Sequence, residues 1–451
     1  MVLLTGCASY QPLPLESPVR PGDTINLLKM DASKHTELPL VWRQRHMHLD
    51  DGLDENEIVQ LAVLNSPRLQ AVQTQLQQAQ AQLIQAGLLP DPQLSLSADI
   101  PAGSDPTLVT GYGFGLGFDL QSLITRGARQ SAASKQARTT YLKVLWQEWQ
   151  IIQQARMLYR RALMQAQQIK LTHAQFLQTQ SNWQVQKNAL DQGNATLDME
   201  GLSRTSMMDA QAAWFEARRQ RNNTMHSLAL LLGLSAQANI PIAPPAQGLS
   251  ALIIAPIEQK PLQQALNNLD HKRPDLLALK TAYQAQEARV RQQILTQFPS
   301  FSIGANRIRD TGGIWTLGPF INLNLPLLNA NRGNIAIARA TRARLRSEYH
   351  HRLTAAETEA SRLASDQQLA FDELAALKNR LPDLDVLMQR MRRALAGGNV
   401  DMLIFTTLQN SHFSQHMKVL MLEQTILEQA VALDTVLGTL PLNMKSTGYQ
   451  P

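Results

Sequence analysis

The sequence predicts a mainly helical protein with a small β part, built from two copies of one plan: helix, β-hairpin, long helix and helix. Three observations predict it. Aromatic residues make up only 5% of the 451 residues, and Ala, Gln, Leu and Arg are abundant, as in long helices packed side by side. Two long segments contain almost no Pro or Gly. Two shorter segments alternate apolar with polar or small side chains, as strands with one apolar face do.

Composition and charge exclude several classes of protein. The 42 basic and 36 acidic residues give a net charge of +6, and 44% of residues are hydrophobic, which excludes a disordered polyelectrolyte. The basic excess is too weak to predict nucleic-acid binding. A single cysteine, Cys7, excludes a disulfide framework and a cysteine zinc site. No window of 18 residues is continuously apolar, so we expect no transmembrane helix.

The amino terminus carries the pattern Leu4-Thr5-Gly6-Cys7, which looks like a bacterial lipobox. We interpret residues 1–7 as a truncated lipoprotein signal, because a signal peptide needs a longer apolar region than six residues. Residues 8–50 are Pro-rich and predict an extended tether. A lipid such as palmitate on Cys7 would anchor the chain without spanning the bilayer. We expect no other cofactor.

The sequence repeats itself at an interval of 205–207 residues. The matching landmarks are Pro67 and Pro274, Pro92 and Pro299, Arg126-Gly127 and Arg332-Gly333, Gly193-Asn194 and Gly398-Asn399, and Leu232-Gly233 and Leu437-Gly438. Such self-similarity predicts a duplicated supersecondary unit. We therefore place a first repeat at 51–234, a Pro-rich connector (the equatorial region) at 235–262, a second repeat at 263–438 and a C-terminal tail at 439–451.

Each repeat begins with a helix and a pair of strands. Apolar residues at helical spacing predict the first helix at about 54–88, and Pro90 and Pro92 end it. The strands are expected at about 92–120 in the first repeat and about 299–325 in the second. Their alternation gives one apolar face and one face of Gly, Ser, Asn and Asp.

Two further helices complete each repeat. The long ones are predicted at about 125–190 and 332–396, and the shorter ones at about 195–233 and 400–438. A helix of about 66 residues would extend roughly 100 Å, so its apolar stripe needs helices of similar length beside it. The Gly-Asn pair after each long helix predicts a reversal of the chain, because glycine readily takes positive φ.

Four strands with one apolar face pose a structural problem. They are too few to close into a barrel and would leave two bare edges. Three copies joined edge to edge would supply twelve strands, within the range of outer-membrane barrels. The apolar face would then contact lipid, and the long helices of three copies would form a tube with water inside and outside.

These residues resemble a known family. Asn65-Ser66-Pro67-Arg68-Leu69, the run from Ala86 to Pro92, Arg126-Gly127 and the two Gly-Asn turns are similar to those of the TolC-like outer-membrane efflux factors. The resemblance covers almost all of the chain after about residue 50. It implies a homotrimer with a 12-stranded transmembrane β-barrel that continues as a long α-helical barrel. The lipobox fits the lipid-anchored branch of this family.

The resemblance also implies a function. A member of this family is a passive outer-membrane channel of a Gram-negative bacterium that extends into the periplasm. It exports small molecules or ions, and its partners are a periplasmic adaptor (membrane fusion) protein and an inner-membrane pump, which we expect to be of the RND type. The sequence does not name the exported substrate. The alternative is a soluble or periplasmic coiled-coil scaffold, which would have no need for two amphipathic hairpins.

Two groups of charged residues are candidates for functional roles. The resemblance places the Gly-Asn turns at the periplasmic tip, an end that closes in this family and where rings of acidic residues bind cations. An ordinary role as acids at helix N-termini is the alternative. Arg126, Arg129, Arg332 and Arg339 lie where each long helix leaves the strands and either contact anionic headgroups or form a solvated face. The tip and gate candidates are Asp191, Gly193, Asn194, Asp198, Glu200, Gly398, Asn399 and Asp401.

The remaining motifs predict no phosphate-binding, metal-binding or catalytic site. The glycines from Gly111 to Gly117 keep a period of two, which fits a strand rather than a phosphate loop. His46-Met47-His48 and the pair His412 and His416, which share a helix face, lack an evident further ligand, so we expect no metal site. No catalytic motif stands out, and we expect no enzyme activity.

Overall fold

The computed structural model describes residues 10–14, 52–102 and 106–438, so Cys7 and the segment at His46 lie outside the described residues. The chain forms two compact units, and each takes segments from both repeats. Unit 1 comprises Met1–Pro67, Ala155–Leu252 and Leu381–Leu420. Unit 2 comprises Arg68–Gln154, Ile253–Arg380 and Met421–Pro451.

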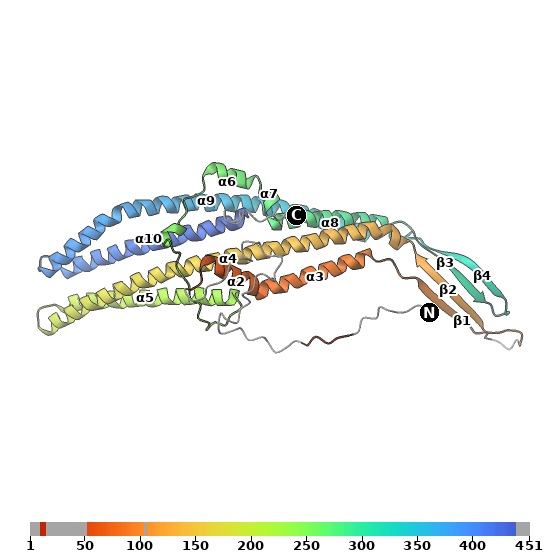
Figure 1. Ribbon diagram of the computed structural model, residues 1–451, viewed down its shortest axis with the longest axis horizontal. Helices are drawn as coiled ribbons and strands as arrows, with labels where there is room; N and C mark the ends of the chain where they lie inside the picture. The colour runs from red at the N-terminus through yellow and green to blue at the C-terminus, as the bar shows by residue number, and fades with distance from the viewer. Residues whose placement is uncertain (1–9, 15–51, 103–105, 439–451) are drawn as a thin grey trace. The chain divides into compact units, whose positions relative to one another are not determined.

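The elements follow the duplicated order that the sequence predicts (Figure 1). The first copy contains α2 (Glu55–Asn65), α3 (Pro67–Gly87), β1 (Gln93–Asp99), β2 (Gly111–Asp119), α4 (Gln121–Asp191) and α5 (Leu197–Leu231). A 3-10 turn, η3 (Leu249–Leu252), lies in the connector. The second copy contains α6 (Gln259–Leu266), α7 (Leu269–Lys272), α8 (Pro274–Leu295), β3 (Ser300–Arg309), β4 (Trp315–Asn324), α9 (Arg332–Ala396) and α10 (Met402–Leu437).

One predicted helix is in fact two. The expected helix at 54–88 is divided into α2 and α3, and the division falls at Ser66. Ser66 has φ −58° and ψ 117°, outside the helical region, because the ring of the following Pro67 disfavours helical backbone in the residue before it. Pro67 then begins α3, a position where its missing N–H costs little.

Unit 2 contains a four-stranded sheet in the order β1-β2-β3-β4, with every pair antiparallel (Figure 1). The central pairing of β2 with β3 joins the two repeats. Leu116, for example, lies opposite Leu94 on one side and Ala305 on the other. In the described residues β1 and β4 each have one unpaired edge.

The helices of unit 2 share an apolar core of their own. Leu276 on α8, Ala360 on α9 and Leu433 on α10 are buried in one cluster with Leu269. Small residues such as Ala356, Ala360 and Ala364 recur along α9 at intervals of four, so they share one face and let the neighbouring helices approach closely.

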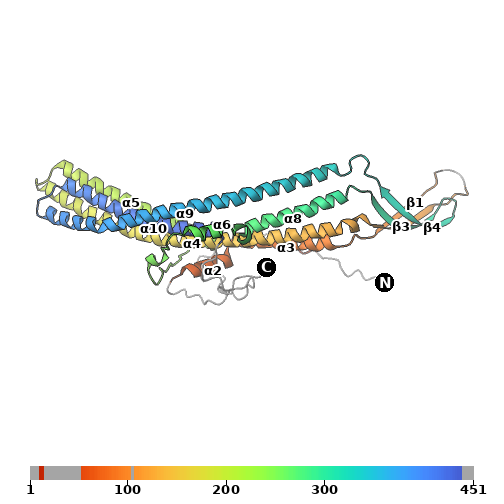
Figure 2. The same cartoon turned by 90° about the horizontal axis from the view of Figure 1, so that it is seen from above.

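Unit 1 contains the turns of two helical hairpins and the helix segments next to them. The α4–α5 and α9–α10 hairpins each reverse at a glycine turn, and Figure 2 shows both turns at the same end of this unit. Met388, Met402 and Phe405 form the buried core beside the second turn. The hairpins are joined by polar contacts, since the Asn182 amide on α4 donates to Gln409 on α10 at 3.0 Å.

Helix α2 is fixed in unit 1 by a capping box and an ion pair. The Asp54 side chain accepts from the backbone N–H of Glu57, and the Glu57 carboxylate accepts from that of Asp54. The Glu55 carboxylate lies 2.9 Å from Nε of Arg156 and 3.0 Å from NH2 of Arg160, both on α4. These contacts anchor the start of the first repeat.

Candidate functional sites on the sheet and at the helix turns

One face of the sheet is apolar and exposed. The register places Leu94, Leu116, Ala305 and Pro319 in one row across the four strands, on the same face. Leu96 is 67% exposed and Ile321 is 70% exposed, values that an apolar side chain in a covered sheet would not have. The alternation read from the sequence is therefore confirmed, and this face lacks a covering layer within the described residues. Its other exposed apolar residues include Leu94, Tyr112, Phe114, Leu116, Ile303, Trp315, Leu317 and Leu323.

The opposite face is lined with small and polar residues that fit closely. A Cβ atom on Gly113 would collide with the Ser97 hydroxyl, and one on Gly304 would collide with the Leu116 carbonyl and the Phe320 ring. These glycines are therefore needed for close packing on this face rather than for binding phosphate. The face that carries Ser, Asn and Gly is the one suited to water.

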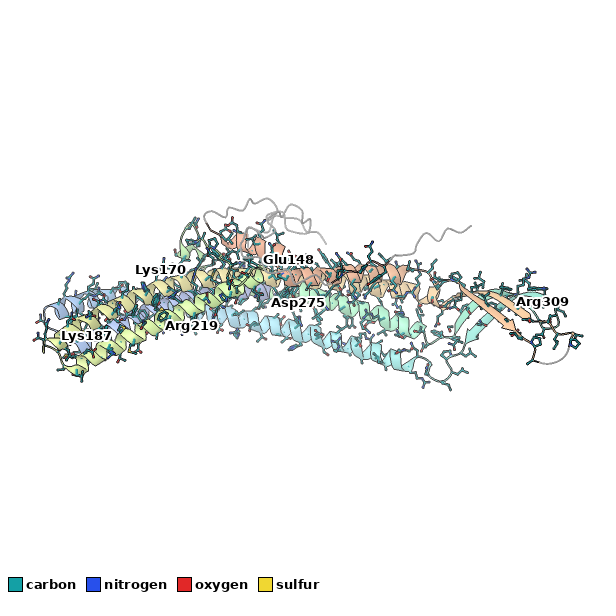
Figure 3. All side chains as sticks on the ribbon, turned by 90° about the horizontal axis from the view of Figure 1, so that it is seen from below. Glu148, Lys170, Lys187, Arg219, Asp275 and Arg309 are labelled. Carbon is teal, nitrogen blue, oxygen red and sulfur yellow. The ribbon has the colours of Figure 1, made fainter. Side chains whose placement is uncertain are left out.

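Charged and aromatic side chains gather at the hairpin end of the apolar face. The Arg307 guanidinium lies 4.8 Å from the Trp315 ring centroid, and Arg309 pairs with Trp315 across the two strands. Figure 3 shows Arg309 near this end of the sheet. Aromatic residues beside cations are typical of the border between hydrocarbon and headgroups.

The two predicted turns have the same geometry. Gly193 has φ +74° and Gly398 has φ +72°, the left-handed region that favours glycine. In each turn the glycine N–H and the following Asn N–H close a pair of hydrogen bonds to the preceding helix, as in a Schellman motif. The structure thus places Gly193, Asn194, Gly398 and Asn399 at chain reversals.

The acidic residues near the turns have local partners. Asp191 and Asp198 are exposed, and a hydrogen bond from Thr196 holds the pKa of Asp198 below its ordinary value. Glu200 accepts a hydrogen bond from the Trp183 indole at 2.8 Å. Asp401 accepts one from the Leu403 N–H at 2.6 Å, as an N-cap does. Figure 3 shows Lys187 beside the first turn. Asp198 and Asp401 thus have the ordinary roles of acids at helix N-termini, whereas Asp191 is the last residue of α4. The gate role stays a prediction for all four acids.

Two of the predicted rim arginines make a contact that the sequence did not reveal. The Arg126 guanidinium donates to the Gly87 carbonyl at 2.9 and 2.8 Å, and that of Arg129 donates to Ala86 and Leu88. They therefore satisfy the last carbonyl groups of α3. Arg332 and Arg339 are exposed on α9. Contact with headgroups stays a prediction for all four.

The expectation that His412 and His416 lack a third ligand is wrong. Asp385 on α9 lies 2.6 Å from Nε2 of His412 and 2.9 Å from Nε2 of His416, which are one turn apart on α10. The three side chains form a group that could hold a metal ion. Asp385 is 27 residues away from His412 along the chain, so sequence spacing could not bring them together.

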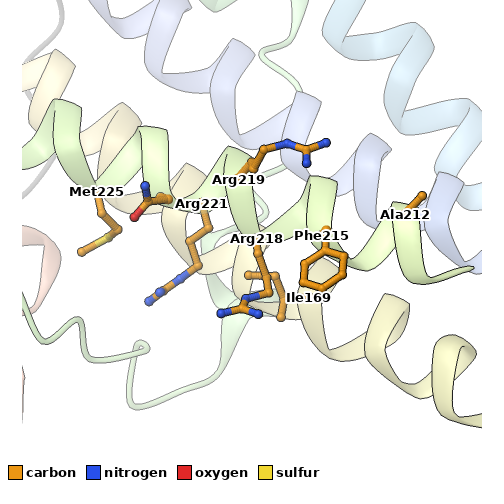
Figure 4. Close-up of a pocket in the computed structure, with 8 residues that line it drawn as sticks. Ile169, Ala212, Phe215, Arg218, Arg219, Arg221 and Met225 are labelled. Carbon is orange, nitrogen blue, oxygen red and sulfur yellow. The ribbon is translucent and has the colours of Figure 1, made fainter.

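A surface groove on unit 1 has mixed apolar and cationic walls (Figure 4). It lies between α4 and α5 and has a volume of about 810 Å³. Arg218 stacks over the Trp214 ring, 5.1 Å from its centroid, so the cation and the aromatic ring form one surface. The lining residues are Ile169, Ala212, Phe215, Arg218, Arg219, Arg221, Asn222 and Met225.

Residues 262–439, which coincide with the second repeat, match the family model "Outer membrane efflux protein". The chain carries an outer membrane efflux protein domain. This confirms the resemblance that the duplicated plan and the Gly-Asn turns suggested. No curated protein sequence matches the chain. Among the described residues, each helix is too short or too polar to cross a bilayer.

Solved outer-membrane channels share the fold over most of the chain. The structure of CusC matches with a TM-score of 0.70 and 18% identity, over 88% of this chain and 95% of that one. VceC of Vibrio cholerae gives 0.70 and 15%, over 85% and 96%. The open state of the MtrE channel of Neisseria gonorrhoeae gives 0.67 and 16%, over 84% and 88%. The fold is therefore that of outer-membrane efflux channels.

Proposed function

We propose that this outer membrane efflux protein is the passive exit duct of a tripartite efflux system, which exports small molecules or ions across the periplasm and the outer membrane of a Gram-negative bacterium. Flow through the duct is diffusion through water and involves no covalent chemistry. The energy comes from a pump in the inner membrane.

The exposed apolar face of the sheet carries this proposal. Leu94, Leu96 and Ile321 are more than half exposed, whereas the reverse face carries Gly, Ser and Asn. At about 25 cal/mol per Å² of apolar surface, leaving such a face in water is strongly unfavourable. Hydrocarbon on one side and water on the other satisfy both faces, as in a transmembrane barrel.

The free edges of β1 and β4 support a trimer. A lipid-embedded sheet cannot leave backbone N–H and C=O groups unpaired, because water is absent there to satisfy them. Pairing β4 of one copy with β1 of the next closes a ring, and three copies supply twelve strands. In this assembly the long helices continue the barrel as a helical tube, and the glycine turns at Gly193 and Gly398 form its periplasmic tip.

We further propose that a lipid on Cys7 anchors the chain to the outer membrane, and that the tip contacts a periplasmic adaptor and an RND-type pump. CusC, VceC and MtrE, which share this fold, are a transmembrane channel, an outer membrane protein and an outer membrane channel, and this supports a place in the outer membrane. A coiled-coil scaffold is less consistent, since it would not place a row of exposed leucines on an open sheet.

Reconstitution into planar lipid bilayers tests the proposal. The full chain, extracted from outer membranes in detergent, should give stable ohmic pores without nucleotide. Protein that remains in the soluble fraction without detergent, or that gives no conductance above the buffer and detergent control, would support the scaffold instead.

A further inference from the structure

The strongest unassigned feature is the cluster of Asp385, His412 and His416 in unit 1. Asp385 lies near the end of α9, and the two histidines lie near the start of α10, so the Gly398 turn brings them together. The candidate ligand atoms come from two helices, one from α9 and two from α10. The outer membrane efflux assignment does not use any of these residues.

The three side chains direct their ligand atoms at one point. Oδ1 of Asp385 lies 2.6 Å from Nε2 of His412 and 2.9 Å from Nε2 of His416, and the two nitrogens are 3.2 Å apart. The imidazole rings are tilted by 61° with centroids 4.5 Å apart, so they converge on the carboxylate instead of stacking. Ligand atoms around a tetrahedral metal with bonds of about 2.0–2.1 Å lie roughly 3.3 Å apart, so shifts of less than about 1 Å would admit an ion.

The cluster is open to solvent. The side chains of His412, His416 and Asp385 are 24%, 30% and 43% exposed. An ion can therefore reach the cluster, and a water molecule has room to complete its coordination.

The donor set selects the class of ion. Two imidazole nitrogens and one carboxylate oxygen suit Zn²⁺ and related transition-metal dications, whereas Mg²⁺ and Ca²⁺ prefer oxygen ligands throughout. Three protein ligands with one open position are typical of zinc sites that retain a water. The cluster contains no cysteine, so it does not favour a strictly thiophilic ion.

We propose that Asp385, His412 and His416 bind one Zn²⁺ per chain, with water as the fourth ligand. The ion links α9 to α10 about three helical turns away from the Gly398 turn. This binding site goes beyond the proposed duct function and does not depend on it, since it lies within one hairpin of one chain.

Isothermal titration with Zn²⁺ tests the site. The full chain is purified in detergent through a tag that lacks histidine and is stripped with a chelator. We expect one Zn²⁺ per chain with a dissociation constant in the micromolar range or tighter. Mg²⁺ should give no comparable binding. Co²⁺ should give the visible absorption of a tetrahedral site.

Matched variants assign the site to these residues. Asp385→Asn keeps the shape of the side chain and should weaken Zn²⁺ binding at least 10-fold, and His412→Gln with His416→Gln should abolish it. The control, His350→Gln with His351→Gln, changes two exposed histidines elsewhere on α9 and should leave binding unchanged. Equal affinity in the wild type and in the folded Asp385→Asn and His412/His416 variants would overturn the proposal, as would absence of stoichiometric binding in the wild type. Circular dichroism establishes that each variant is folded.

Discussion

Arg273 and Asp275 form a buried bidentate ion pair at the start of α8. Nε of Arg273 lies 3.0 Å from Oδ1 of Asp275, and its NH2 lies 2.8 Å from Oδ2. The same guanidinium donates to the Val436 carbonyl at 2.9 Å and stacks over Trp146 at 4.8 Å. One side chain thus ties α8 to the end of α10 and to α4 within unit 2.

Replacing the carboxylate of this pair should be costly. Asp275→Asn leaves the Arg273 charge, whose side chain is only 8% exposed, without its anionic partner. Breaking a buried pair in this way costs about 3 kcal/mol. We expect a lower midpoint in denaturant unfolding. The matched control is Glu216→Gln, which breaks the exposed pair with Arg219 and should lower stability far less, because solvent screens that pair. Equal losses in the two variants would contradict this account.

Replacing two glycines of the α4–α5 hairpin by alanine should change its stability in opposite directions. Gly193→Ala forces φ +74° on an alanine and should destabilise the α4–α5 hairpin by about 1 kcal/mol. Gly201 lies inside α5, and beyond the backbone of its own helix a methyl group there would meet no neighbouring atom within 4 Å, so Gly201→Ala should stabilise the helix by about 0.5–1 kcal/mol. Thermal unfolding measures both. A stabilising Gly193→Ala would show that the turn relaxes to another conformation.

Adjacent positions on β1 test which face contacts lipid. Leu96→Lys places a charge on the apolar face and should prevent assembly in the outer membrane, because lysine near the bilayer midplane costs about 2–4 kcal/mol in a barrel. Ser97→Lys places the same charge on the opposite face and should be tolerated. Detergent extraction of outer membranes followed by native gel electrophoresis compares them. Normal assembly of the Leu96 variant would remove the lipid-facing assignment.

The acidic residues after the turns test the gate. Asp198→Asn with Asp401→Asn removes charge near the tip while asparagine retains the capping geometry at 401. If these side chains narrow the entrance and attract cations, conductance in planar bilayers should rise and block by divalent cations should weaken. Asp209→Asn, an exposed acid farther along α5, is the control. Unchanged conductance and unchanged block would leave both as ordinary acidic residues at helix N-termini.

The sequence predicted the features that depend on local periodicity. The alternation of Leu94 and Leu96 with Ser95 and Ser97 fixed the strand faces, and Gly193 and Gly398 marked the two reversals. Pro67 indicates a break in the helix at Ser66, because the residue before a proline avoids helical backbone. The apolar residues keep their helical spacing across this position, however, so the pattern predicts one continuous helix.

Contacts between helices far apart in the sequence could not be predicted in the same way. Asp385 meets His412 because of the relative rotation of α9 and α10, which side-chain packing beside the turn determines. Arg126 reaches the Gly87 carbonyl because β1 and β2 return the chain to the end of α3. Periodicity gives the faces of each helix but not which faces meet.

In the proposed assembly, one chain supplies four strands of a twelve-stranded barrel that three chains complete. Native mass spectrometry of the detergent-extracted, untruncated protein measures this directly. We predict a species of three 50.2 kDa chains with any bound lipid, which dissociates only when the fold is lost. A folded species of a single chain as the sole form in detergent would contradict the account.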